Sequence, residues 1–315
     1  MINVEKEVFN IYSTNFLWKL VENFEDRRID LLKIREKKRE EIEKGILPNF
    51  LENTKEVRIN KWVVSKVPNI LKKRHVEIMS PPDRKSIINA LNSEADCYMC
   101  DFGDSLSPNF DNIKKGHINL YDAIRKNIVF RDEEEKKIYQ VNDYKNIPII
   151  FVRPRGIHLE EKNIDTYCEK KICASLFDFA YYFFNNVSEL ISMGRGPYFY
   201  LPKLENHYEA RWWNDIFNFS EDYFSLPRGT IRATVIIENI LAAFEMDEIL
   251  FELRHHSAGL NYERFNYIFS YFNLFKNNRN YLSPDRKLIT LETHFIKSYV
   301  NLLIKTCHKR DAYAI

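Results

Sequence analysis

The stretch "IPIIFVRP", residues 147–154, decides the fold class of this chain. Its apolar run, 149–152, contains three β-branched residues and is closed by Arg153. An uninterrupted apolar run of this length is typical of a strand buried on both faces, as in a parallel sheet. Short, largely apolar runs with a polar residue at or near their end occur at five other places: "VEIMS" (76–80), "DCYMCDF" (96–102), "GPYFYLPK" (196–203), "TIRATVIIE" (230–238) and "HSAGLN" (256–261).

Amphipathic stretches lie between these runs, and their apolar spacing predicts helices. They include "KSIINALNSE", "LFDFAYYFFNNVSELISMG", "HYEARWWNDIFNFSEDYF" and "AAFEMDEILFELR". Strands that alternate with helices predict βα units and a parallel sheet. We therefore expect an α/β fold, a TIM (β/α)8 barrel, over residues 73–315. An open doubly wound sheet is the alternative, but no G-x-G-x-x-G opens the first helix and no G-x-x-x-x-G-K-[ST] is present.

Residues 1–72 carry many charges and no strand-like alternation, which predicts a helical segment. Within it, "EDRRIDLLKIREKKREEIEKG" (25–45) alternates in charge sign around a few apolar residues. This pattern is typical of a solvated helix with intrahelical ion pairs.

Composition excludes several classes of protein. The 315 residues are 45% hydrophobic, and 47 basic against 45 acidic residues give a net charge of +2. Nucleic-acid binding is not expected, because it needs a clustered excess of Lys and Arg. No run of 18 apolar residues and no signal peptide are found, so we expect no membrane association and a cytoplasmic location.

The five cysteines stand at positions 97, 100, 168, 173 and 307, a spacing that suggests no disulfide framework. The "CYMC" motif at 97–100 has no second pair or histidine cluster at zinc spacing. We interpret it as part of a buried strand, with a redox or metal role as the alternative.

Polar residues end the predicted strands, and active sites of barrels lie at the carboxyl ends of the strands. Cations, carboxylates and amides around one rim suit a small anionic substrate with a divalent metal. Any one of them alone is as well explained by a structural salt bridge. These residues are Asp101, Asp104, Arg153, Arg155, Lys203, Glu205, Glu238 and the stretch from Asn261 to Asn266.

Longer motifs resemble the malate synthase family of the A type: "DRKSIINALNSEADCYMCDF", "VRPRGIHLEEK", "GPYFYLPKLENHYEARWWNDIF", "GTIRATVIIENILAAFEMDEILFELRHHSAGLN" and "LIKTCHKRDAYAI". The resemblance implies an N-terminal helical clasp, here residues 1–72, a TIM barrel and a C-terminal helical domain. It also implies condensation of acetyl-CoA with glyoxylate, assisted by magnesium. A small-molecule acid and an acyl-CoA, or another acyl carrier, are the implied partners.

Residue by residue, Arg153 matches the arginine that polarises the aldehyde in this family, and Glu238 matches the first magnesium ligand. The second ligand position, an aspartate in the family, is filled by Asn266. We expect weak magnesium binding or none, because a carboxylate is missing there. The residues expected to support the metal or substrate are Asp101, Asp104, Arg155, Asn261, Glu263, Arg264 and Phe265.

Further departures surround the same positions. Gly103 stands where the family has a glutamate, and Glu263 stands where it has a glycine, in a loop whose N–H groups bind the glyoxylate carboxylate. A side chain at 263 is expected to require a different backbone geometry and to repel an anion. His255 and His256 are expected to lie behind the metal ligands or at the surface, rather than to bind a metal, since adjacent positions on a strand point to opposite faces.

The sequence ends in what we expect to be the eighth strand, without the family's C-terminal domain and its aspartate base. Two hypotheses stay open. One is a malate synthase-like enzyme that makes or breaks a C–C bond between an acyl-CoA and a glyoxylate-like acid. The other is a catalytically degenerate relative that serves as a binding or scaffold module. A second protein chain that covers the open barrel rim is a further candidate partner.

Overall fold

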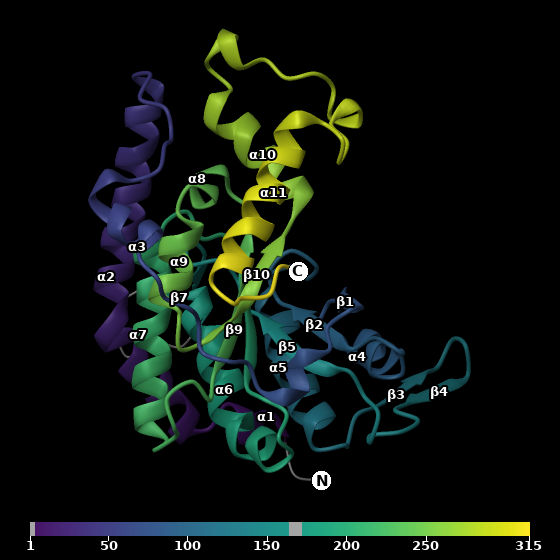
Figure 1. Cartoon of the computed structure of the whole chain (residues 1–315). Coiled ribbons are helices and arrows are strands. Elements are labelled where there is room, and N and C mark those ends of the chain that lie inside the picture. Colours follow the sequence, from purple (N-terminus) through teal and green to yellow (C-terminus); the bar gives the residue numbers. More distant parts are fainter. Residues whose placement is uncertain (1–3, 164–171) are drawn as a thin grey trace. The chain divides into compact units, whose positions relative to one another are not determined.

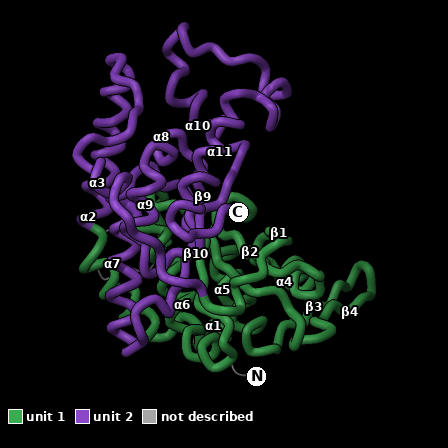
Figure 2. Tube along the Cα trace, viewed as in Figure 1, with its two compact units in different colours: residues 1–25, 68–200 green, residues 26–67, 201–315 purple. Residues whose placement is uncertain are grey.

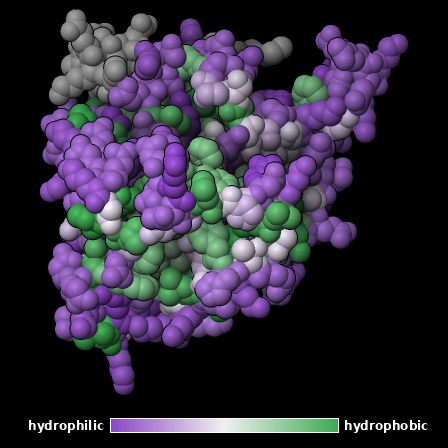
Figure 3. Space-filling view, turned by 90° about the horizontal axis from the view of Figure 1, so that it is seen from above, coloured by the Kyte–Doolittle hydropathy of each residue, from purple (hydrophilic) through white to green (hydrophobic). Residues whose placement is uncertain are grey.

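The computed structural model describes residues 4–163 and 172–315. These residues form two compact units (Figure 2). Unit 1 comprises residues 1–25 and 68–200, and unit 2 comprises residues 26–67 and 201–315. Hydrophilic residues make up much of the face in Figure 3, with hydrophobic residues exposed between them.

Four parallel strands follow one another in unit 1, and the first three of them are labelled in Figure 1. They are β1 (Glu77–Ser80), β2 (Cys97–Asp101), β5 (Ile149–Arg153) and β8 (Tyr198–Leu201). Their register pairs Cys97 with both Glu77 and Ile149, and Val152 with Phe199. All five residues of β5 are buried, which explains its uninterrupted apolar sequence.

The connections between these strands contain the helices α4 (Arg84–Leu91), α5 (Phe110–Ile124) and α6 (Ala174–Ser192). Two of them begin with a side-chain cap: Asp83 accepts from the amide of Ser86, and Asn109 from the amide of Asn112. Each parallel strand needs such a crossover, so the alternation read from the sequence is confirmed in this unit.

The N-terminal segment forms the helices α1 (Val4–Val8) and α2 (Ile11–Glu43), as expected. Up to Glu25, α2 belongs to unit 1, where Phe16 contacts the rings of Phe183 and Phe184 at centroid distances of 6.1 and 5.8 Å. The remainder belongs to unit 2 together with η1 (Glu52–Thr54) and α3 (Lys55–Ile59), while η2 (Asn69–Lys72) lies in unit 1. The assignment of 1–72 as a clasp and 73–315 as the barrel stays a prediction.

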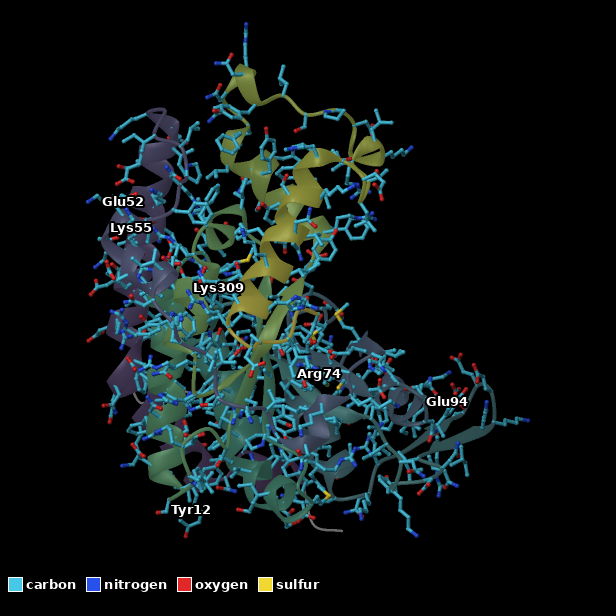
Figure 4. The ribbon with its side chains drawn as sticks, in the orientation of Figure 1. Tyr12, Glu52, Lys55, Arg74, Glu94 and Lys309 are labelled. Carbon is cyan, nitrogen blue, oxygen red and sulfur yellow. The ribbon has the colours of Figure 1, made fainter. Side chains whose placement is uncertain are left out.

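A polar cluster lies at the start of β1 in unit 1. Arg74, labelled in Figure 4, donates from Nε to Glu77 Oε1 at 2.6 Å and from Nη2 to the hydroxyl of Tyr200 at 2.8 Å. Its guanidinium also lies 4.6 Å from the ring centre of Phe151. The cation is thus satisfied on its edges by acceptors and on its face by an aromatic ring.

Unit 2 contains the parallel strands β9 (Arg232–Ile237) and β10 (Ser257–Tyr262). Its helices are α7 (His207–Tyr223), α8 (Ile240–Ala243), α9 (Met246–Glu252), α10 (Arg264–Phe275) and α11 (His294–Lys309), with the 3₁₀ turns η3 (Arg279–Tyr281) and η4 (Arg286–Leu288). None of the helices in the described part of the chain combines the length and the apolar character that a membrane span needs.

The last residues of the sequence pair with β10 in parallel. The amide of Leu260 donates to Tyr313 at 2.9 Å, and the amide of Ile315 donates back to Leu260 at 2.9 Å. Gly259 makes this approach possible: its φ is +113°, and an added Cβ would lie 2.4 Å from the Tyr313 carbonyl oxygen. In chain order this segment follows six parallel strands of the described residues, so it is the seventh. The expectation that the sequence ends in the eighth strand was therefore wrong.

Two small antiparallel pairs were not predicted. A hairpin is formed by β3 (Val129–Asp132) and β4 (Lys137–Gln140), and a short pair by β6 (Glu160–Glu161) and β7 (Ile172–Cys173). The six strands expected from apolar runs are confirmed. All of these runs except 76–80 are mostly buried, whereas β3 and β4 are largely exposed and have no apolar run that would have predicted them.

Candidate active site

Arg153 stands at the carboxyl end of β5, beside the carboxyl end of β2. The strand register pairs it with Asp101, and its Nη1 lies 3.4 Å from Asp101 Oδ2. Its Nη2 donates to Asp104 Oδ2 at 2.6 Å. The side chain of Arg153 is 4% exposed, whereas that of Asp104 is 41% exposed. The structure thus brings three of the predicted site residues together and leaves one of them open to solvent.

Asp101 fixes the loop that carries Asp104. This fully buried carboxylate accepts from the amides of Gly103 at 2.8 Å and Asp104 at 3.3 Å. It also accepts from the amide and hydroxyl of Ser105 at 3.0 and 2.7 Å. These bonds turn the chain back after β2, so that Asp104 reaches the guanidinium of Arg153. Asp101 is therefore an anchor of the loop as well as a partner of the arginine.

Arg155 takes part in a different cluster, although it is only two residues further on. Its Nη2 donates to Asp178 Oδ1 at 2.8 Å, and its Nη1 donates to Glu161 Oε2 at 2.8 Å, with all three side chains buried. Burial opposes ionisation of Asp178, but the charge and hydrogen bonds of Arg155 hold its pKa below the ordinary value. This network ties the segment after β5 to α6. A substrate role for Arg155 stays a prediction.

Glu238 follows β9 and is almost fully buried. Both of its carboxylate oxygens are bound by Lys203, which follows β8. The amide of Lys203 donates to Oε1 at 2.8 Å, and its ammonium donates to Oε2 at 2.8 Å. Lys203 adopts a φ of 59°, which a side-chain-bearing residue rarely adopts, so this contact is held against backbone strain.

The loop that carries Lys203 is held by α2. Arg35 Nη2 donates to the Lys203 carbonyl at 2.7 Å, and its Nε donates to Glu209 Oε1 at 2.7 Å. Arg39 Nη2 donates to Glu205 at 3.0 Å. The expected solvated helix is therefore wrong at this face: Arg35 is buried and pairs with α7, although pairs such as Lys33 with Asp30 remain on the surface.

The helical spacing of the sequence could have indicated that Arg35 is buried. Positions 28, 31, 35 and 42 are all buried and follow helical spacing. Two of these positions are arginines, which hid the buried stripe among the other charges.

Glu263 is the N-terminal cap of α10. Its carboxylate accepts from the amides of Phe265 at 3.0 Å and Asn266 at 2.6 Å. Its φ is −134°, an ordinary extended value. A side chain at position 263 is therefore accommodated without backbone strain. The carboxylate occupies amide donors at the start of the helix, where an anion would otherwise be favoured.

Tyr299 connects the start of α10 to the end of β9. Its hydroxyl donates to the carbonyl of Ile237, the residue before Glu238, and accepts from the amide of Glu263 at 3.4 Å. The ring of Tyr299 stacks on Tyr267 at a centroid distance of 3.8 Å. Glu238 and the turn that carries Asn266 thus belong to elements that are tied together within unit 2.

The remaining predicted residues near this turn are less enclosed. Asn261 is half-buried on β10 and pairs in register with Ile236. The guanidinium of Arg264 lies 4.5 Å from the ring centre of Phe265, which is exposed. Direct contact of these three residues with a substrate stays a prediction.

Of the two adjacent histidines, one is a surface residue, as expected, and the other is buried against α7. His256 is fully buried, with Nε2 3.2 Å from Glu221 Oε2 and Nδ1 3.1 Å from Asn214 Oδ1. His255 is exposed. Cys97 and Cys100 are buried in β2, and burial raises the pKa of the Cys97 thiol to about 12, which makes it unreactive. Cys168 lies outside the described residues.

Parallel strands that alternate with helices, with charged residues at their carboxyl ends, are typical of a (β/α) barrel. Two family models match the chain, "Malate synthase, TIM barrel domain" over residues 149–315 and "Malate synthase, N-terminal domain" over residues 3–56. The chain belongs to the malate synthase family, and the predicted TIM-barrel fold class is confirmed.

Curated relatives agree with this assignment. A malate synthase of Myxococcus xanthus is 47% identical over 309 residues, which cover 98% of this chain and 56% of the relative. The glyoxysomal malate synthase of Candida tropicalis is 45% identical, with 98% and 56% covered. Malate synthase A of Escherichia coli is 44% identical, with 99% and 58% covered. The chain thus spans little more than half the length of these relatives.

The residues at the predicted magnesium position fit a divalent cation poorly in this structure. Magnesium is usually held by one or two carboxylates together with waters. Both oxygens of Glu238 accept from Lys203, and position 266 holds an amide. Within the described residues no three His, Cys, Asp or Glu side chains form a group that could hold a metal. We therefore assign no catalytic step to a metal, and weak magnesium binding stays a prediction.

Proposed function

We propose that this chain carries the barrel site of a malate synthase-type acyltransferase, which joins the acetyl group of acetyl-CoA to glyoxylate or a closely related aldehyde or keto acid. Arg153 is the observation that supports the proposal. A guanidinium at the carboxyl end of a barrel strand lies where the chemistry of this fold takes place.

In the proposed reaction the methyl carbon of acetyl-CoA gives up a proton to a base and bonds to the carbonyl carbon of the acid, and water then cleaves the thioester to release the thiol. Arg153 binds the carbonyl oxygen of the acid and stabilises the negative charge that develops there when the new C–C bond forms. Asp101 keeps the guanidinium in place from the buried side, at 3.4 Å. Asp104 binds it from the exposed side and can yield to a substrate oxygen, since its side chain is open to solvent. The acyl-CoA donor and a cytoplasmic location are parts of the same proposal.

A second candidate function is a binding module that has lost catalysis. The contacts of Lys203 with Glu238 favour it, because they neutralise the carboxylate assigned to the metal. The cap formed by Glu263 also favours it, since this carboxylate occupies two helix amides. Such a module would bind the acid without consuming acetyl-CoA.

Calorimetric titration with glyoxylate tests the role of Arg153. We expect saturable binding by the unmodified chain and a loss of affinity of about tenfold or more in Arg153→Lys, because lysine cannot form the two-pronged contact of a guanidinium. Arg131→Lys, on the exposed strand β3, is the matched control and should bind as the unmodified chain does. Equal affinities of the Arg153→Lys variant and the unmodified chain would contradict the proposal.

A further inference from the structure

A cavity of about 470 Å³ lies in unit 1 at the amino end of β5, the opposite end from Arg153. Its apolar lining includes Ile124 at the end of α5, Ile150 on β5 and Leu190 near the end of α6. Volumes of this order, with mostly apolar walls and a few polar groups, are typical of sites for small molecules. None of the residues discussed for the acyltransferase site lines this cavity.

Three cations line the same cavity, and carboxylates do not neutralise them. Lys126 and Lys145 form no ion pair within the described part of the chain. The guanidinium of Arg195 donates to the carbonyls of Ile147 and of Pro148, the latter at 3.1 Å. Burial lowers the pKa of Arg195, so its charge is held at a cost that a bound anion would reduce.

The one carboxylate in the lining, that of Asp143, forms hydrogen bonds within its own loop. Asp143 accepts from the amide of Lys145 at 2.8 Å through Oδ1 and from the side chain of Asn146 at 2.8 Å through Oδ2. It therefore shapes the loop between β4 and β5. The lining as a whole keeps an excess of positive charge next to an apolar surface.

The backbone at Lys126 makes the presence of a lysine there informative. Its φ is 63°, directly after the end of α5, and its amide donates to the Ala123 carbonyl at 3.1 Å. Glycine is the favoured residue in this conformation after a helix. A lysine in this conformation lowers the stability of the folded chain relative to glycine, so its presence suggests that the side chain has a role. Complementing the negative end of the helix dipole is one such purpose, and binding an anion is another.

We propose that this cavity binds a small amphipathic carboxylate. Its apolar body would lie on Ile124, Ile150 and Leu190, and its carboxylate would meet Lys126, Lys145 and Arg195. The chemistry of the lining requires both parts of the ligand: acetate lacks the apolar body, and a neutral alcohol lacks the charge.

The test uses octanoate as the probe and the full chain as the protein, with calorimetry as the readout. Octanoate should bind saturably, while acetate, inorganic phosphate and octan-1-ol should bind about tenfold more weakly or not at all, since each lacks one of the two recognised parts. Lys126→Gly should weaken octanoate binding about tenfold while leaving the unfolding midpoint in urea unchanged or higher. The matched control is Lys136→Gly, which relieves a φ of 50° in the β3–β4 turn, outside the cavity, and should leave binding unchanged.

Two results would overturn the proposal. One is the absence of octanoate binding, or binding of equal strength to octan-1-ol or phosphate. The other is an affinity of the Lys126→Gly variant for octanoate equal to that of the unmodified chain. A lower unfolding midpoint in Lys126→Gly with unchanged binding would show that the lysine serves the helix end alone.

Discussion

Lys203 binds both oxygens of the Glu238 carboxylate, through its amide and through its ammonium, each at 2.8 Å. One residue thus supplies a neutralising charge and a backbone donor to the carboxylate that the family resemblance assigns to magnesium. The carbonyl of Lys203 is held in turn by Arg35 at 2.7 Å. The state of Glu238 therefore depends on a helix that lies far from it in the sequence.

Removal of the ammonium is expected to strengthen magnesium binding. In Lys203→Met the carboxylate of Glu238 keeps its amide partner but loses the competing cation, and a charge removed at a partly wet site changes binding by about tenfold or more. Magnesium titration by calorimetry measures the effect. Lys305→Met, an exposed lysine on α11, is the control and should bind as the unmodified chain does. If Lys203→Met gains no affinity, the lysine is not what weakens the site.

Restoration of the family's carboxylate at position 266 is expected to act in the same direction. Asn266→Asp alone, or together with Gly103→Glu, should bind magnesium about tenfold more tightly, because divalent cations favour carboxylate over amide oxygens. Asn273→Asp adds the same charge further along α10 and should have little effect. Equal affinities of the revertants and the unmodified chain would show that these positions do not limit metal binding.

The buried histidine of unit 1 should make the protein less stable at mildly acidic pH. Burial lowers the pKa of His117 from 6.5, although Asp178 lies 3.7 Å away and favours the charged form. Below pH 6.5 the unfolded chain takes up a proton at this residue that the folded chain does not, so stability falls as the pH falls. Urea unfolding between about pH 7.5 and about pH 5.5 measures this loss.

His117→Phe should reduce the loss of stability over that pH range, because phenylalanine can occupy the aromatic surroundings without titrating. His75→Phe, at an exposed position, should keep the full loss. An unchanged pH dependence in His117→Phe would mean that other groups cause the effect.

A side chain at position 259 should prevent the last residues from pairing with β10. The Cβ of Gly259→Ala would lie 2.4 Å from the Tyr313 carbonyl oxygen, in addition to a φ of +113°. We expect the free energy of unfolding to fall by about 3 kcal/mol or more, against about 1 kcal/mol for Gly45→Ala. Gly45 has a φ of +93° but no atom near its added Cβ, so it isolates the backbone cost. Equal losses in a urea titration would show that the contact with Tyr313 adds nothing.

Strands buried on both faces could be predicted because burial leaves a direct trace in the sequence. The run before Arg153 is continuous and the run before Glu238 is mostly apolar, and both residues stand where a strand ends in the structure. The hairpin of β3 and β4 leaves no such trace, since most of its side chains face solvent. The position of a charged residue at a strand end is therefore easier to predict than a small exposed sheet.

The partners of the charged residues could not be predicted. Arg35 and Glu209 are 174 positions apart in the chain, and nothing local to either residue indicates the other. Glu263 illustrates a different limit: its charge was noticed, but the cap it forms depends on α10 beginning at the next residue. Whether Arg153 and Glu238 share one pocket stays a prediction, because they belong to different units.

Release of free thiol from acetyl-CoA in the presence of glyoxylate tests the proposed function most directly. The unmodified chain is predicted to release thiol only when both substrates are supplied, and Arg153→Lys is predicted to lose about a hundredfold or more of this rate, the cost of removing a group that stabilises a developing oxyanion. Arg131→Lys should retain the full rate. The absence of glyoxylate-dependent thiol release by a chain that binds glyoxylate would contradict the acyltransferase and favour the binding module.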